Sequence, residues 1–317
     1  MALPSGAQFG RNAQLLLVND NQALDLSNLR FRFTIEAADV ETPNVAFIRA
    51  YNLNDVTVKQ AINEYSGVVI GAGYDGNPGT IFKGTVKQFH RGKEKNVDNF
   101  LDIFAADGDL AYNFGFANSN LPAGSTNQGR FNNLVSALGV PADPTAPSFL
   151  SNTGGILPRG KVLFGLARDY MRDLATSNNA RWSIQDGVVT LIPLTGYLPG
   201  EAVELNSATG MLNVPVATDQ GIRVQSLLNP KLRVGGRIIL NNKDITATTI
   251  KQQFFPGYTD FNLVANVDPS ADGTYRIIVI EHSGDTRDIE WYTNMICLSV
   301  DPSSPADQSV LPFGIPK

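Results

Sequence analysis

Gly273-Thr-Tyr-Arg-Ile-Ile-Val-Ile-Glu-His282 is followed by Ser283-Gly-Asp-Thr-Arg287 and then by Asp288-Ile-Glu-Trp-Tyr-Thr-Asn-Met-Ile296. β-branched and aromatic residues fill the first and third of these segments, whereas glycine and aspartate interrupt the second. Two such apolar runs joined by a short polar turn predict a β-hairpin.

An earlier stretch repeats this pattern. It has a first arm over residues 79–90, a turn at 91–93 and a second arm over 97–104. Each first arm ends in a His-x-Gly step, at one of the chain's two histidines, His90 and His282. Because an internal repeat is the mark of a duplicated architecture, the sequence predicts two β domains related by duplication. The alternative is a chance match, because hairpins resemble one another.

Length and charge narrow the class of protein. A chain of 317 residues is long enough for two or three domains, and 43% hydrophobic residues can form a sizeable core. The net charge of −5 argues against a broad nucleic-acid surface, which would be basic, and against binding to an anionic membrane. The low charged fraction, 17%, is typical of a surface that partners cover.

The single cysteine, Cys297, excludes an intramolecular disulfide and any zinc site built from several cysteines. It alternates within an apolar strand pattern, so we expect a buried and inert thiol. The N-terminal residues lack the basic and apolar regions of a signal peptide, and the apolar run 15–18 is too short to cross a bilayer. We therefore expect folding in the cytoplasm.

The first 118 residues read mainly as strands. Strands are expected over 12–18, 29–38, 45–53 and 68–70. Between the last two, Asp55 is expected to be the N-cap of a short helix with one apolar stripe.

The middle of the chain changes composition, because Asn, Ser, Gly and Pro accumulate over residues 115–158. Helical spacing of apolar residues predicts helices over 131–138 and about 160–176. Asp186-Gly187 between two apolar runs predicts a tight hairpin over 181–192.

From residue 196 the chain again reads as strands. Besides the hairpin over 273–296, β-like segments cover 221–228, 237–240, 245–250 and 262–266. The C-terminal residues are rich in proline, which predicts an extended tail.

Together these patterns predict a mainly β fold with an α+β insertion. We expect a first β domain over 1–118, an α+β middle domain over 119–205 whose last strands either stay in it or return to the first domain, a second β domain over 206–303, and a tail over 304–317.

Three stretches look like chemical motifs but lack the partners that the chemistry needs. The G-x-G-x-x-G at 71–76 is followed by a strand, not by the helix that would meet a pyrophosphate. Asp107 and Asp109 lack the further acidic ligands of a calcium loop. Neighbouring side chains in the run 282–285, His-Ser-Gly-Asp, point to opposite faces of a strand, so they do not form a catalytic triad. We expect no catalytic, cofactor or metal site.

Three stretches of the chain carry a resemblance to a known family. They are Gly73-Tyr74 with Ile81-Phe82-x-Gly84 and Asp107-Gly108; Gly221-Ile-x-Val-x-Ser-Leu-Leu-Asn-Pro-x-Leu-x-x-Gly235; and Gly273-x-Tyr275 with His282-Ser-Gly-Asp-Thr286 and Trp291. In these stretches the chain resembles the baseplate hub proteins of contractile-tailed bacteriophages, the group that includes the hub of phage Mu and, more distantly, that of phage T4.

The resemblance implies two tail-tube-like β-barrel domains with smaller α/β pieces between them. It further implies a homotrimer whose six barrels meet the hexameric tail tube protein, with the central puncturing spike on the opposite face and other baseplate proteins around it. DNA would pass through the ring only transiently, with no membrane binding. The location would be the virion tail baseplate, assembled in the host cytoplasm.

The candidate contact residues come from the strand expected over 29–38. Its apolar residues alternate with Arg30, Arg32, Thr34 and Glu36, which places these four on the outward face of the first barrel. They could line the lumen or meet a neighbouring copy. An ordinary solvated strand face explains the alternation equally well.

Two other functions compete with the assembly role. A tail-tip cell-wall hydrolase or peptidase would need a convergent catalytic set, which the sequence does not show. A glycan-binding β-sandwich could use Trp182, Trp291 and Tyr275 to stack on sugars, although aromatic residues in strand-like runs are more often buried.

Overall fold

The computed structural model describes residues 10–19, 21–75, 77–95, 98–150, 156–218, 221–240, 246–247 and 273–300. The strand expected over 262–266 and the tail over 304–317 lie outside these residues. Most of the segment expected over 245–250 does so as well.

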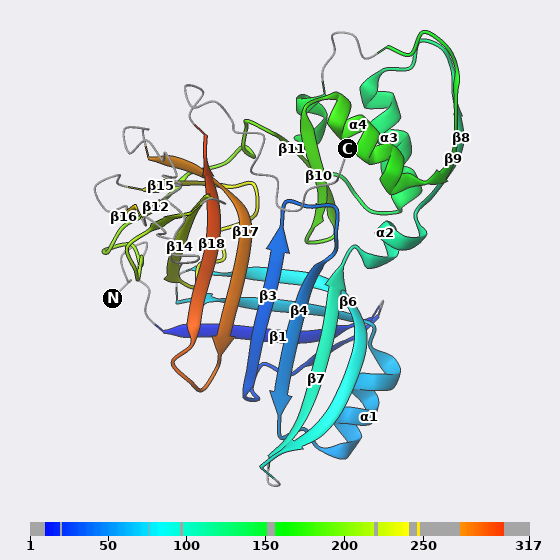
Figure 1. Cartoon of the computed structure of the whole chain (residues 1–317). Helices are drawn as coiled ribbons and strands as arrows, with labels where there is room; N and C mark the ends of the chain where they lie inside the picture. Colours follow the sequence, from blue (N-terminus) through cyan, green and yellow to red (C-terminus); the bar gives the residue numbers. More distant parts are fainter. Residues whose placement is uncertain are drawn as a thin grey trace, which may run out of the picture.

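The first β half wraps seven strands around one core. Its elements are β1 (Arg11–Val18), β2 (Ala23–Asp25), β3 (Phe31–Ala38), β4 (Asn44–Tyr51), α1 (Asp55–Glu64), β5 (Gly67–Tyr74), β6 (Asn77–Glu94) and β7 (Asp98–Asp107). The strands pair in the order β3-β4-β7-β6-β5-β1-β2. In Figure 1, β1 runs across β3 and β4, so the sheet curls back over its own inner face.

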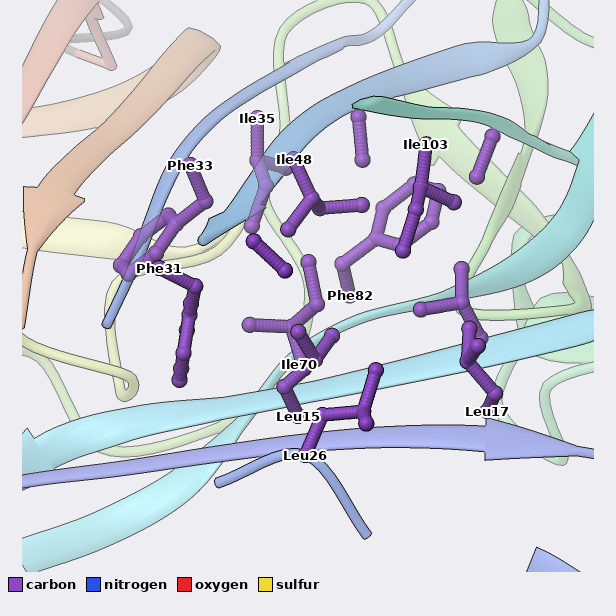
Figure 2. Packing of buried hydrophobic residues seen from close by; sticks show 14 of the residues in the cluster. Leu15, Leu17, Leu26, Phe31, Phe33, Ile35, Ile48, Ile70, Phe82 and Ile103 are labelled. Carbon is purple, nitrogen blue, oxygen red and sulfur yellow. The ribbon is translucent and has the colours of Figure 1, made fainter. Parts of the chain in front are cut away.

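Alternation along each strand produces the core of this half. Phe31, Phe33 and Ile35 are buried on one face of β3, and Leu15 and Leu17 are buried in the same way on β1. Figure 2 shows these side chains converging with Ile48, Ile70 and Ile103 from three further strands. Their burial removes a large apolar area from water, which is the main force that closes the sheet.

The insertion has its own core and lies beside the first half (Figure 1). Its elements are α2 (Asp109–Phe114), β8 (Phe116–Leu121), α3 (Asn127–Leu138), the short η1 (Ala146–Phe149), β9 (Lys161–Leu166), α4 (Ala167–Ser177), β10 (Ala180–Gln185) and β11 (Val188–Pro193). The hairpin predicted around Asp186-Gly187 is confirmed, with both residues in the left-handed region, as a two-residue turn requires. β10 and β11 pair with each other and with no other strand among the described residues.

The helix expected over 160–176 is wrong in its first third. Residues 161–166 form β9, which pairs with all six residues of β8, and α4 begins at Ala167. Leu163 and Leu166 fit helical spacing, but Leu163 is buried between the exposed Val162 and Phe164, which is the period of a strand. The pairing of β9 with a distant segment decided between the two.

The second β half has shorter strands among the described residues. Its elements are β12 (Val203–Leu205), β13 (Val216–Thr218), β14 (Gly221–Leu227), β15 (Arg237–Leu240), β16 (Thr246–Ala247), β17 (Thr274–Asp285) and β18 (Trp291–Ser299). The quoted hairpin is confirmed as β17 and β18, although its first arm extends to Asp285. Cys297 is fully buried in the core of this half, as expected.

The two halves share one continuous sheet. The distal part of β17, Val279–Asp285, pairs antiparallel with β3 from Ala38 to Arg32. β3 and β17 lie side by side at the centre of Figure 1. A strand from beyond the insertion therefore completes the edge of the first half.

The same ladder of strands occurs in both halves. The order β3-β4-β7-β6-β5 of the first half corresponds to β13-β14-β18-β17-β15 of the second, and every one of these neighbours is antiparallel. The corresponding elements also follow one another along the chain in the same order.

The registers match as well. In both hairpins the first arm carries one bulged residue, Lys87 in β6 and Ile278 in β17. The pairs Ala46–Ala105, Ile48–Ile103, Ala50–Leu101 and Val68–Gly84 of the first half then coincide with Ile222–Cys297, Val224–Met295, Ser226–Thr293 and Ile238–Tyr275 of the second. The fold is mainly β, with an α+β insertion between two β domains of one pattern, as the sequence predicted. The domain boundaries expected at residues 118 and 205 stay predictions.

The two histidines are not equivalent positions in this ladder. With the bulges aligned, His90 corresponds to Glu281, and His282 corresponds to Arg91. A shift of one residue moves a side chain to the other face of a sheet. His90 is accordingly 60% exposed, whereas His282 is buried.

Candidate assembly surface

The outward face of the shared sheet carries three of the four predicted contact residues. Arg32, Thr34 and Glu36 alternate with the buried residues of β3 and point away from the core. Their neighbours continue the same face across both halves. On β4 these are Arg49, Phe47 and Val45, and on β17 they are Asp285, Ser283 and Glu281.

Arg30 lies just before β3 and connects the two halves. Its guanidinium contacts the carboxylate of Asp285 on β17 at 2.7 Å and lies 4.9 Å from the centre of the Tyr51 ring. The Arg30 side chain is 43% exposed, so the pair is partly screened by water. Arg30 thus helps to join the halves, a contact that the sequence could not reveal because 255 positions separate the partners.

Glu36 lies directly opposite Glu281 at the junction of the halves. Two like charges in cross-strand positions repel each other and weaken the pairing. The rest of the β3–β17 junction must compensate for this repulsion.

A charged cluster occupies the outward face of the first half. Arg49 donates to both oxygens of Asp102 at 2.5 and 2.9 Å and lies over the Phe100 ring, 3.9 Å from its centre. His90 lies 3.5 Å from the same carboxylate. Asp102 is buried, so a two-point contact with arginine supplies the partners that it would otherwise lack. The alternating pattern of β4 and β7 could have indicated these residues.

The corresponding positions of the second half are less charged. Arg49, Asp102 and His90 correspond to Gln225, Asn294 and Glu281. They line an open groove of about 510 Å³ on the outward face of β14, β17 and β18. One wall of that groove is the segment that carries Asn213 and Val214. The two halves therefore present one backbone pattern with two different surfaces.

A buried ion cluster ties all three parts together. Asp39, at the end of β3, lies 3.0 Å from Arg181 of the insertion and 3.4 Å from Arg276 of the second half. Arg276 is 4% exposed and also donates to the carbonyls of Pro193 and Gly196. This cluster fixes how the parts sit relative to one another.

Asp107 anchors the insertion to the first half. Its Oδ1 accepts a hydrogen bond from the amide of Gly187 at 2.8 Å, at the tip of the β10–β11 hairpin. Burial, with the nearby charge of Asp186, raises the pKa of Asp107 to about 7. The role of this carboxylate is structural, and the described residues contain no group of three potential metal ligands.

The insertion also exposes a patch of large apolar side chains. Phe114, Phe116, Val162 and Phe164 are 74%, 48%, 68% and 67% exposed. Phe116 and Phe164 stack edge to face across the β8–β9 ribbon, with ring centres 5.2 Å apart. An apolar patch of this kind is typical of a contact surface.

His282, Ser283 and Asp285 do not form a relay. His282 contacts Thr293 through Nδ1 at 2.9 Å, and its burial lowers its pKa to about 4. Asp285 turns instead to Arg30. The geometry therefore agrees with the expectation that neighbours on this strand point apart.

The aromatic residues considered for glycan binding are inside the protein. Trp182, Trp291 and Tyr275 are 0%, 1% and 1% exposed. Trp291 packs edge to face on Phe33, at 5.5 Å between ring centres, and belongs to the core of the first half. None of the three can stack on a sugar at the surface.

Among the described residues no helix is long and apolar enough to cross a membrane.

Neither the protein-family models nor the curated proteins contain a match to this sequence. Solved structures do resemble the fold. The prophage MuSo2 43 kDa tail protein from Shewanella oneidensis is similar with a TM-score of 0.54 and 8% identity, over 90% of this chain and 98% of that one. The tail protein from Neisseria meningitidis MC58 is similar with a TM-score of 0.53 and 10% identity, over 91% and 96%. The fold is that of phage tail proteins.

Proposed function

We propose that this protein is a structural component of a phage tail, and that it acts as the trimeric hub of a contractile-tail baseplate. The observation that carries the proposal is the repeated ladder, in which the strands of both halves pair in one order and register. Three copies of a chain with two such halves contain six ladders. A three-fold ring can thereby match a six-fold partner.

The partners follow from that symmetry. The six ladders would meet the hexameric tail tube protein on one side, and the three-fold body would receive the central spike on the other. Other baseplate proteins would surround the ring, and the exposed apolar patch of the insertion is a suitable contact for them. The outward face with Arg32, Thr34 and Glu36 would line the lumen, where DNA passes without being held.

The proposed role is assembly and not catalysis, with no cofactor. Its location would be the virion baseplate after assembly in the host cytoplasm. Within the chain we propose domains over 1–118, 119–205 and 206–303, followed by a tail over 304–317.

Native mass spectrometry and electron microscopy test the proposal. The chain, alone or mixed with the tail tube protein of the same virion, should form a trimer of about 103 kDa, three times its 34.2 kDa. The images should show a ring with six similar densities. A chain that stays monomeric under both conditions, or that degrades cell-wall material, would overturn the proposal.

A further inference from the structure

We propose that the tip of the β10–β11 hairpin forms a pH-sensitive contact between the insertion and the first half. The contact is firm while the Asp107 carboxyl holds a proton and weakens when that proton is lost. We call residues 184–187 of the hairpin, together with Asn44 and Asp107, the tip contact. It goes beyond the proposed function, because it concerns how one chain holds its insertion and does not require a trimer.

The tip contact is made by hydrogen bonds. The side-chain amide of Asn44 donates to the carbonyl of Ile184 at 3.1 Å and to the side chain of Gln185 at 2.8 Å. The amide of Gly187 donates to Asp107 at 2.8 Å. Figure 1 shows the hairpin reaching from the insertion to the ends of β3 and β4. The insertion and the first half have separate apolar cores, so the strength of this contact depends mainly on polar groups.

Asp107 is the member of the tip contact that can change its charge. It is 2% exposed, and its Oδ1 accepts the hydrogen bond from Gly187. Its Oδ2 is buried and has no hydrogen-bond partner among the described residues. A negative charge on a buried oxygen without a donor is costly, whereas a neutral carboxyl avoids most of that cost. The closed contact therefore favours the protonated acid.

The charged groups near Asp107 do not offset this cost. Asp186, beside Gly187 in the turn, is a second carboxylate, and its charge further raises the pKa of Asp107. Lys83 of β6 and Arg233 of the second half act on Asp186 instead, whose Oδ2 lies 3.8 Å from the Arg233 guanidinium. None of the ion pairs in the described part of the chain includes Asp107.

The element on the other side of Asp107, α2, contributes a neutral group. The hydroxyl of Tyr112 accepts a hydrogen bond from the amide of Ile184 at 2.8 Å, and burial raises the pKa of Tyr112 well above its usual range. Tyr112 therefore stays protonated where Asp107 titrates, and Asn44 does not titrate at all. Asp107 is consequently the group whose proton controls the contact.

The sign of the effect follows from where the proton is bound. In the closed contact, burial raises the pKa of Asp107 from 3.8 to about 7. When the tip moves away, water reaches the carboxylate and restores the lower value. Closing therefore takes up a proton between these two pKa values, and the ratio of closed to open molecules should fall about tenfold from pH 6 to pH 8.

Opening is confined to the tip of the hairpin. At the other end of β10, Arg181 stays bound to the buried Asp39 at 3.0 Å. Gly108, with a φ of 71°, follows Asp107 directly and leads into α2. Because glycine accepts backbone changes that other residues resist, the link on the α2 side can adjust as the tip moves. The pair of Arg181 and Asp39 is then the fixed end of the hairpin.

Amide hydrogen exchange of Gly187 tests the tip contact. Full-length protein labelled with ¹⁵N-glycine is followed by NMR at pH 6 and pH 8, and each rate is compared with the intrinsic rate of an unprotected amide at that pH. The protection of Gly187 should fall about tenfold from pH 6 to pH 8. Equal protection of Gly187 at both pH values would overturn the proposal.

Gly115 is the internal control of the same experiment. Its amide donates to the carbonyl of Ala111 within the insertion, so its protection should not depend on the tip contact. It should stay constant between pH 6 and pH 8. A parallel fall at Gly115 and Gly187 would mean that the whole insertion loosens, which contradicts an effect confined to the tip.

Two variants assign the pH dependence to its cause. Asp107→Asn keeps an acceptor for Gly187 but cannot ionise, so the protection of Gly187 should change less than about twofold between pH 6 and pH 8. Glu41→Gln removes the charge that pairs with Arg172 of the insertion, and it should leave the tenfold fall in place. A fall that persists in Asp107→Asn, or that disappears in Glu41→Gln, would contradict the role of Asp107. If Asp107→Asn does not fold, the comparison of Gly187 with Gly115 in the native protein still decides.

The outcome is separate from that of the proposed function, because the measurement follows one amide inside one chain. A trimer in which Gly187 shows no pH dependence contradicts the tip contact alone. A monomer in which Gly187 responds as expected supports the tip contact and contradicts the hub.

Discussion

The first and second β halves share a backbone pattern but not a surface. α1 links β4 to β5 in the first half, whereas the corresponding link, residues 228–236, consists of turns. Inside the ladder, Ile103 and Leu101 of the first half correspond to Met295 and Thr293, and all four are buried. The pattern of hydrogen bonds and of inward and outward faces is thus retained where the side chains differ.

This difference shows which property the sheet requires. A ladder accepts any side chain of suitable polarity and size, because its hydrogen bonds come from the backbone. The outward positions are then free to diverge, as Arg49 and Gln225 do. The charged cluster of the first half and the open groove of the second can therefore serve different contacts on one scaffold.

The largest expected effect concerns Trp291, a residue of the second half that packs in the core of the first half. Trp291→Ala should lower the free energy of unfolding by about 4 kcal/mol, because it removes a buried aromatic side chain that packs on Phe33. Urea unfolding followed by circular dichroism measures the change. The matched control is Asn99→Ala at the corresponding position of β7, with an expected change within about 0.5 kcal/mol. Equal effects of the two variants would contradict the asymmetry between the halves.

The ion cluster between the parts should have the next largest effect. Asp39→Ala leaves Arg276 buried without its carboxylate and should cost about 3 kcal/mol. The same urea experiment measures it. Glu41→Ala, which removes a partly exposed partner of Arg172, is the control and should cost less than about 1 kcal/mol. A small loss for Asp39→Ala would mean that the halves hold their arrangement without this cluster.

A double-mutant cycle can convert one surface into the other. Arg49→Gln alone should cost about 2 kcal/mol, because it leaves the buried Asp102 short of a charged partner. Adding Asp102→Asn recreates the Gln–Asn pair of the second half, so the double variant should be about 1 kcal/mol more stable than the sum of the single effects. Additive effects would show that the two residues do not act as a pair.

The smallest expected effect is a pH dependence that the second half lacks. Asp107 has a pKa of about 7 in the folded protein and corresponds to Ser299 in the second half. Between pH 4 and pH 7 the folded state holds a proton that the unfolded state has lost, so this group makes the protein less stable as the pH rises.

The Asp107→Asn variant isolates this contribution. The difference in unfolding free energy between variant and native protein should grow in the variant's favour by about 1–2 kcal/mol from pH 6 to pH 8. Urea titrations at both pH values measure it. A difference that is constant with pH would show that Asp107 is already ionised in the folded protein at pH 6.

The sequence by itself determined the local secondary structure: individual strands, their two faces and the tight hairpins. Period-two alternation predicted β3 and the faces of Arg32 and Glu36, and turn residues predicted the β10–β11 and β17–β18 hairpins. These features depend on a few neighbouring residues, so a short stretch of sequence contains enough information to specify them.

Only the tertiary structure decided which distant edges meet. It gave β3 its partner β17, made a strand of residues 161–166, and placed the bulges that separate His90 from His282 by one step of the ladder. Strand pairing is made by backbone groups that are the same in almost every residue, so its register and partners follow from how the whole chain packs and not from any local sequence.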